Sequence, residues 1–249
     1  MAKMAFVAMF DFLGFKEARR KHGTDGLLKI YKNVMLPFIR MVMQSNIQCH
    51  IVSDSIILFS DGDTYDDFRA IITVSKKILW SGFAGHKVPL RGAIGYGDLV
   101  IDDEAIWMGS AIEDAYQGEQ SQVWSGCVLT EAAEKFCIHN GYIARWTQEV
   151  AAEALITSDP DKRKYCHAYE NVLLSYKIPV QVKNRTAAVK YKTRKGLAIN
   201  WPIDLADGIA QDHIAPSTNA HATRIKTNTL DFEKCARAFN AAHLAKYPP

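Results

Sequence analysis

The sequence predicts an α+β fold in which helices pack on a mainly antiparallel sheet. Two observations lead to this prediction. Apolar, β-branched segments of strand length occur in neighbouring pairs, as in β-hairpins, and the longer segments between them have apolar residues at three- and four-residue spacing, as in amphipathic helices. Because hairpins alternate with helical crossovers, the pattern is that of a ferredoxin-like sandwich.

In the first third of the chain, each predicted element has a recognisable boundary. The first strand is followed by Asp11, and the long helix after it contains glycines at positions 23 and 26 that can interrupt it. Asp63 or Thr64 can cap the next helix, which has acidic residues in its first turn. The elements expected here are strands over 4–10, 47–53 and 55–60 and helices over 14–44 and 64–82.

The rest of the chain continues the pattern less regularly. The glycines of Gly95-Tyr96-Gly97-Asp98 predict a turn that divides residues 90–101 into two strands. Residues 139–175 have no pattern that identifies an element, and the basic residues between 183 and 196 predict a solvated loop. The other elements expected are helices over 109–122, 131–138 and 229–245 and strands over 126–129, 178–183 and 197–200.

The composition is that of a globular protein, and it argues against several classes of function. Of the 249 residues, 48% are hydrophobic and 23% are charged, and the net charge of +3 is too small to indicate a nucleic-acid partner. The five cysteines have no CxxC spacing, so they support neither a disulfide framework nor a zinc site. No apolar run approaches about 20 residues and the N-terminus does not resemble a signal peptide, so we expect a cytoplasmic protein without a membrane partner.

Two aspartates at the ends of predicted strands are the most informative residues. Asp11 follows an apolar strand, and Asp54 lies in a Ser-Asp-Ser turn between two apolar strands. If the strands are neighbours, both carboxylates lie at one edge of the sheet and repel each other unless a cation binds between them. Mg²⁺ commonly takes one or two carboxylates together with substrate phosphates. The alternative is a helix cap for Asp11 and a turn residue for Asp54; we favour metal ligands.

Four segments resemble motifs of the class III nucleotidyl cyclases, and they occur in the same order as in that family. Residues 10–15 are similar to its first metal motif and residues 52–55 to its second, in which Gly-Asp usually stands. Residues 91–100 resemble its arginine-led strand, and residues 106–116 resemble its Gly-x-x-Val-Asn-x-Ala segment. Residues 179–183 and 198–202 look like bacterial single-domain relatives. The chain as a whole most resembles the pyrimidine cyclases of Pycsar anti-phage defence.

The resemblance implies a metal-dependent phosphoryl transfer. The ribose 3′-hydroxyl of a nucleoside triphosphate attacks its own α-phosphate, pyrophosphate leaves, and a 3′,5′-cyclic nucleotide forms. Two divalent ions, Mg²⁺ or Mn²⁺, would be held by Asp11, Asp54 and the carbonyl of Phe12. The amides of Leu13, Gly14 and Phe15, at a turn into a helix, would bind the β- and γ-phosphates.

Two positions depart from the family in a way that bears on the base. His50 stands where the family has a purine-reading Lys or Glu, and Ile106 stands where adenylyl cyclases have an Asp. Isoleucine cannot accept a hydrogen bond from an exocyclic amine, whereas an imidazole can bond the edge of uracil. UTP is therefore the favoured substrate and cyclic UMP the expected product. The alternative for His50 is a packed structural residue.

Two further departures concern catalysis. By alignment from Gly109, Glu113 replaces the ribose-orienting Asn of the family, and Gln117 replaces its transition-state Arg. Glutamine can donate a hydrogen bond but has no positive charge. Lys183 loosely matches the family's phosphate-binding lysine, with Arg185 as the other candidate, although the same basic residues could form a solvated turn.

The resemblance also implies a homodimer in which the metal aspartates and the base-reading residues come from opposite subunits. We expect a catalytic domain over residues 1–202 and a helical extension over 203–249 that packs on it. An effector that senses the cyclic nucleotide in anti-phage defence is implied by the resemblance alone. The alternatives are a cytidylate or purine cyclase, a degenerate cyclase-homology domain that senses nucleotide, and a ferredoxin-like phosphate-binding module without catalysis.

Overall fold

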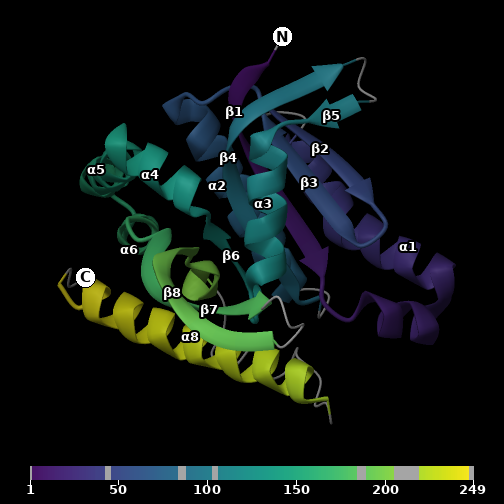
Figure 1. Ribbon diagram of the computed structural model, residues 1–249. Helices are drawn as coiled ribbons and strands as arrows, with labels where there is room; N and C mark the ends of the chain where they lie inside the picture. The colour runs from purple at the N-terminus through teal and green to yellow at the C-terminus, as the bar shows by residue number, and fades with distance from the viewer. Residues whose placement is uncertain are drawn as a thin grey trace.

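The computed structural model describes residues 2–42, 46–83, 88–102, 106–183, 189–204 and 219–246. Their eight strands form a sheet in the order β2-β3-β1-β4-β6-β8-β7, with β5 paired to β4 (Figure 1). The pairing between β4 and β6 is parallel, and the other strand pairs are antiparallel. The strands are β1 (Lys3–Phe12), β2 (Ile47–Val52), β3 (Ser55–Ser60), β4 (Leu90–Asp102), β5 (Ile106–Met108), β6 (Gly126–Leu129), β7 (Leu173–Lys183) and β8 (Val189–Ile199).

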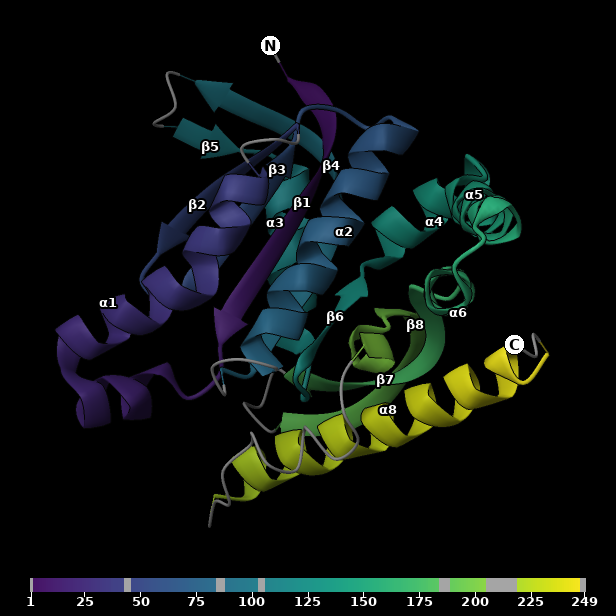
Figure 2. The same cartoon turned by 180° about the vertical axis from the view of Figure 1, so that it is seen from behind.

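Helices cover both faces of this sheet, which confirms the predicted α+β class. Helices α1 and α2 lie on one face and α3 on the other, as the two opposite views show (Figures 1 and 2). The helices are α1 (Phe15–Val42), α2 (Tyr65–Ser81), α3 (Ser110–Ser121), α4 (Glu131–His139), α5 (Tyr142–Ile156), α6 (Pro160–Tyr169) and α8 (Ala220–Leu244), with a 3₁₀ turn η2 (Trp201–Asp204). Within the described ranges, every helix is too short or too polar to span a bilayer.

The alternation of side chains along β1 separates two apolar clusters. Phe6, Ala8 and Phe10 belong to the larger cluster, which includes the buried residues of α2. Ala5 and Val7 point the other way and pack with Ala111 and Ala115 of α3. Because successive residues of a strand face opposite sides, the odd-numbered Asp11 lies on the α3 face.

Two local predictions at the helices are confirmed. The long helix α1 is interrupted at Gly23, whose φ of 68° and ψ of 176° are not helical. Helix α2 begins with a capping box, in which the Thr64 side chain accepts from the amide of Asp67 and the Asp67 carboxylate accepts from the amide of Thr64. The capping box fixes Thr64, rather than Asp63, as the cap.

The predicted turn at residues 95–98 is wrong, because β4 is one continuous strand. The glycines are needed for close packing instead of for a turn. A Cβ atom at Gly95 would lie 2.5 Å from the amide nitrogen of Ala115, and one at Gly97 would lie 2.9 Å from the amide nitrogen of Ala111. Helix α3 therefore lies directly on the backbone of β4.

Several other elements differ from the prediction. The unassigned segment 139–175 contains α5, α6 and the start of β7, and the short strand β5 was missed. The basic segment is mostly strand, because Lys190, Lys192, Arg194 and Lys195 lie on β8. A paired strand can place such long side chains in solvent at alternate positions, so a run of charge did not identify a loop.

The C-terminal helix α8 packs along β7, η2 and α6. Its buried residues include Phe232, whose ring centroid lies 4.5 Å from that of Trp124 and 4.9 Å from that of Tyr176. It begins nine residues before the predicted start, at Ala220 instead of 229. Its N-cap is Asn219, whose side chain accepts from the amides of His221 and Ala222.

Candidate active site

In the structure, Asp11 lies near the end of β1 and Asp54 lies in the adjacent turn between β2 and β3, at the same end of neighbouring strands. Strands β1 and β3 are neighbours, with Asp11 opposite Ser55, and the amide of Phe12 donates to the carbonyl of Asp54 at 3.1 Å. Asp54 lies in the two-residue turn between β2 and β3, in which Ser53 has a left-handed φ of 57°. That conformation favours glycine, and this chain has a serine there.

The pKa of the Asp11 carboxyl reflects its burial and two charged neighbours. Burial raises the pKa of the Asp11 carboxyl, the Arg91 guanidinium opposes this shift, and the nearby Asp54 carboxylate adds to it. The two carboxylates are thus close enough to repel each other in a partly desolvated place. A divalent cation between them would remove the repulsion.

The donor set fits a hard divalent ion. Carboxylate oxygens from Asp11 and Asp54 are ligands that Mg²⁺ and Mn²⁺ accept, and Mg²⁺ usually completes its shell with water and substrate phosphate oxygens. Across the described ranges, no three His, Cys, Asp or Glu side chains gather into a metal-binding group. An ion here would therefore need oxygens from a bound phosphate, as expected for a substrate-dependent metal.

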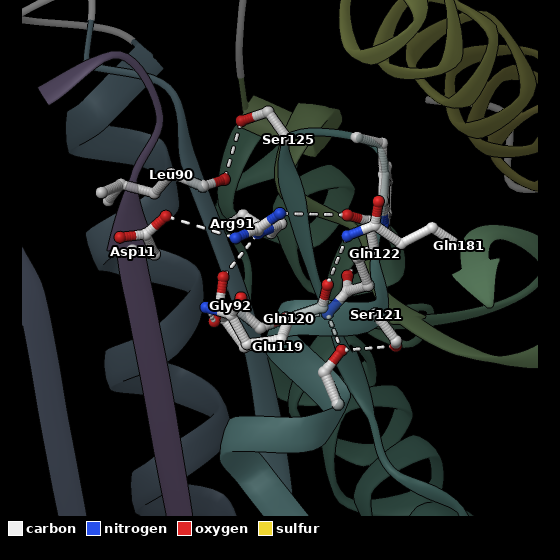
Figure 3. A network of polar contacts seen from close by, with 12 residues as sticks. Asp11, Leu90, Arg91, Gly92, Glu119, Gln120, Ser121, Gln122, Ser125 and Gln181 are labelled. Atoms are coloured by element: carbon white, nitrogen blue, oxygen red, sulfur yellow. Dashed lines mark hydrogen bonds and ion pairs between the residues drawn. The ribbon is translucent and has the colours of Figure 1, made fainter. Parts of the chain in front are cut away.

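A buried arginine lies beside Asp11 (Figure 3). Arg91 is opposite Asp11 in the pairing of β1 with β4, and its side chain is 9% exposed. Its Nη2 lies 3.3 Å from Oδ2 of Asp11, its Nε donates to Oε1 of Glu119 at 2.5 Å, and its Nη1 donates to the carbonyl of Gln122 at 3.2 Å. Glu119 is 3% exposed, and burial raises its pKa although the Arg91 charge opposes the shift.

In the turn that is predicted to bind phosphate, one backbone amide already donates a hydrogen bond within the chain. Gly14 has a φ of 85° and lies immediately before α1, so the turn itself is as predicted. The amide of Leu13, however, donates to the carbonyl of Pro89 at 3.0 Å. This bond occupies the Leu13 donor in the folded chain, so a phosphate oxygen would have to take the place of the Pro89 carbonyl; binding of phosphate by the amides of Leu13, Gly14 and Phe15 stays a prediction.

His50 lies on the α3 face of the sheet in an aromatic cluster. Its ring centroid is 4.2 Å from that of Trp107 and 5.7 Å from that of Phe59. The indole Nε1 of Trp107 is buried and has no hydrogen-bond partner among the described residues. Ile106, the neighbour of Trp107 on β5, is 51% exposed. The ring contacts of His50 are those expected of a packed structural residue, which is the alternative to a base-reading role.

The remaining predicted residues that the structure describes belong to α3 and to the end of β7. Glu113 and Gln117 are exposed, one turn apart on α3, while Ala111 and Ala115 of the same helix face β4. Lys183 is the last residue of β7, and Arg185 lies outside the described residues.

The comparisons with known proteins bear on the fold. The sequence matches no protein-family model and no curated protein. The structure is similar to the catalytic core of a rhodopsin-guanylyl cyclase with converted specificity in complex with ATPαS, with a TM-score of 0.52 and 7% identity over 80% of this chain and 99% of that chain. The chain has the nucleotidyl cyclase catalytic fold. The guanylate cyclase domain of RhGC from Catenaria anguillulae in complex with GTP is similar to the same degree, with a TM-score of 0.52 and 8% identity over 80% of this chain and 97% of that chain.

Within this cyclase fold, sequence reasoning missed Arg91 and Glu119 as candidate site residues. Arg91 was noticed as the first residue of a motif, but its side chain was given no role. Its position opposite Asp11 depends on the register between β1 and β4, which are separated by almost eighty residues. The available signal was an arginine at the start of a glycine-rich strand whose next six residues are uncharged, where burial would require a carboxylate partner.

Proposed function

We propose that the protein is a metal-dependent nucleotidyl cyclase that converts a nucleoside triphosphate to a 3′,5′-cyclic nucleotide and pyrophosphate. The observation that carries the proposal is the pair of carboxylates, Asp11 and Asp54, at adjacent strand ends of a cyclase fold, with a buried arginine beside them. A sheet edge with two acidic ligands and one fixed cation can accept both metal ions and phosphate.

Asp11 and Asp54, with the carbonyl of Phe12, would hold two divalent ions, Mg²⁺ or Mn²⁺. Such ions activate the attacking oxygen and neutralise the leaving phosphates. Arg91 is the nearest fixed positive charge, since its Nη2 lies 3.3 Å from Asp11. It offers a cation where Gln117 has none, and a guanidinium suits phosphate oxygens in geometry as well as charge.

The amides of Gly14 and Phe15, at the start of α1, would bind the terminal phosphates with the help of the helix dipole. Lys183 and Arg185 remain candidates for further phosphate contacts. Substitution of either basic residue by Gln would test its role, since loss of a phosphate contact should raise the KM for the nucleotide.

UTP is the proposed substrate. The β5 strand offers Ile106 and so no acceptor for the amine of adenine or cytosine. The unpartnered indole N–H of Trp107, in contact with His50, is a buried donor that a carbonyl of uracil could satisfy. Equal amounts of UTP, CTP, ATP and GTP in competition give the test. A mixture dominated by a cyclic purine would overturn the base assignment, and cyclic CMP would overturn the part played by His50.

The active assembly is proposed to be a homodimer with shared sites. Glu113 and Gln117 are exposed on α3, so both are accessible to a partner subunit. Exposed apolar side chains on β2, β5 and α3 would be accessible to a second subunit: Ile51, Val52, Ile106, Met108 and Tyr116. Mixing inactive Asp54→Ala with inactive His50→Ala should restore one site per heterodimer. No recovery despite subunit exchange would mean that each site is built within one chain.

The basic experiment is incubation of the purified protein with each ribonucleoside triphosphate and Mn²⁺, followed by detection of cyclic product. Asp11→Ala and Asp54→Ala should each abolish it. Asp61→Ala is the matched control, because Asp61 is an exposed strand-end aspartate whose ion pair with Lys3 at 3.8 Å is also exposed. Near-native turnover of either site variant would end the two-metal proposal.

The second candidate is a cyclase-homology domain that binds nucleotide without converting it. Glu113 and Gln117 favour this candidate, because neither carries the positive charge expected in the transition state. Nucleotide binding that depends on Mn²⁺, without cyclic product from any of the four substrates, would support it. A cyclic-nucleotide-sensing effector and a role in anti-phage defence belong to the first candidate alone.

A further inference from the structure

The residues between α3 and β6 hold the backbone on both sides of Arg91. In the segment 122–125, the carbonyl of Gln122 accepts from Nη1 of Arg91, and the Ser125 hydroxyl donates to the carbonyl of Leu90 at 2.7 Å (Figure 3). The Gln122 side chain also donates to the carbonyl of Gly92 at 2.7 Å. The position of Arg91 therefore depends on where the segment 122–125 lies.

Three successive residues of this segment are held by one face of the C-terminal helix α8. The Asn228 side chain donates to the carbonyl of Val123 at 2.6 Å. The amide of Ser125 donates to the hydroxyl of Thr229 at 2.8 Å. Between them, the ring of Trp124 packs edge-on against Phe232 of the same helix. Asn228 and Thr229 precede Phe232 by four and three residues, spacings that place each of them beside Phe232 on the helix surface.

The contact of α8 with Trp124 also extends to Gln122. The indole N–H of Trp124 donates to Oε1 of Gln122 at 2.8 Å, which orients the amide whose nitrogen bonds Gly92 and Gly118. The helix is thus linked to the Arg91 guanidinium through main-chain and side-chain contacts alike. Ser125, Gln122 and Thr229 are fully buried, so water does not replace a bond lost among them.

We propose that α8 positions Arg91 in the candidate active site, with Asn228 and Thr229 as its positioning residues. The consequence for turnover rests on the proposed cyclase function, whereas the consequence for the Arg91 side chain does not. Thr229→Val keeps the shape of the side chain but leaves the buried amide of Ser125 without an acceptor. The segment 122–125 would then move to find another partner, and the carbonyl of Gln122 would move with it.

The direct test is the Nε–Hε resonance of Arg91 in a ¹H–¹⁵N spectrum, assigned by its loss in Arg91→Lys. We expect Thr229→Val to shift or broaden this resonance and Thr229→Ser, which keeps the hydroxyl, to leave it near the native position. Asn228→Leu, which removes the donor to Val123, is a second variant for use if Thr229→Val does not fold. Asn240→Leu is the matched control, because it removes buried hydrogen bonds to Asn200 elsewhere on α8.

Turnover provides a second measurement. Loss of one buried hydrogen bond should lower kcat/KM roughly 5- to 50-fold in Thr229→Val, with no further loss when Arg91 is already Lys. The Asn240→Leu control should lose stability without this loss of rate. An Arg91 resonance that stays in place in the folded Thr229 and Asn228 variants would refute the proposal. If the native protein cyclises no nucleotide, the proposed function fails, and the resonance alone decides whether α8 positions Arg91.

Discussion

Replacement of Arg91 by Met should destabilise the protein by an amount that depends strongly on pH. Arg91 contacts two carboxylates, of which Glu119 is 3% exposed, and methionine has a similar length without charge or donors. Removing one member of a buried ion pair costs about 3–5 kcal/mol. That is a large share of the roughly 5–15 kcal/mol by which a domain is stable.

The sign of the pH dependence follows from the direction of the pKa shifts. Burial already raises the folded-state pKa of Glu119 and of Asp11, and the Arg91 charge opposes both shifts. Without Arg91 both pKa values rise further above their unfolded values. A carboxyl with a raised pKa favours the folded state below its unfolded pKa and loses that contribution as the pH rises through its folded pKa. The cost of Arg91→Met should therefore be smallest near pH 4 and largest at neutral pH.

The assay is urea unfolding of the native protein and of Arg91→Met between about pH 4 and pH 8, with a chelator present to remove metal ions. The difference in unfolding free energy should increase across this range by about 1.4 kcal/mol for each unit by which a carboxyl pKa rises. Arg69→Met is the control, because Arg69 forms an exposed ion pair with Glu149 at 3.5 Å and should cost at most about 1 kcal/mol. A cost for Arg91→Met that is equal at all pH values would refute the reasoning.

Three further predictions follow from the same geometry. Mn²⁺ together with a nucleoside triphosphate should raise the melting temperature of the native protein but not of Asp11→Asn or Asp54→Asn, because a ligand that binds the folded state stabilises it. Equal shifts in all three proteins would exclude these carboxylates as metal ligands. Gly95→Ala should cost more than about 2 kcal/mol in a denaturant titration, since its Cβ would lie 2.5 Å from a backbone nitrogen of α3; a neutral effect would mean that α3 does not lie on β4. Trp107→Phe should leave the free protein equally or more stable, because it removes a buried donor without a partner among the described residues. The same substitution should lower the preference for UTP, and an unchanged preference would exclude the indole from base selection.

Local patterns predicted the first half of the fold well. The strand over 4–10, the hairpin at Asp54 and the interruption of α1 at Gly23 each depend on a few adjacent residues, and each is confirmed. The segment 139–175 was not assigned because its sequence pattern did not separate α5, α6 and the start of β7. The length of β8 was underestimated because its basic residues were assigned to a loop, and the missed start of β7 lies in the unassigned segment.

Sequence patterns predicted Asp11 and Asp54 but not the contact between Arg91 and Glu119. The glycines of β4 that were misread as a turn explain why this contact was missed. Asp11 and Asp54 are close because each ends a local element, so their sequence context was sufficient. Glu119 reaches Arg91 because α3 lies on the backbone of β4, and that approach is possible only where Gly95 and Gly97 have no side chains. A pattern that resembles a turn when it is read alone is, in the folded chain, the surface that places a buried carboxylate against the arginine beside Asp11. The charge balance of the site therefore depends on a helix-to-strand contact that no local pattern encodes.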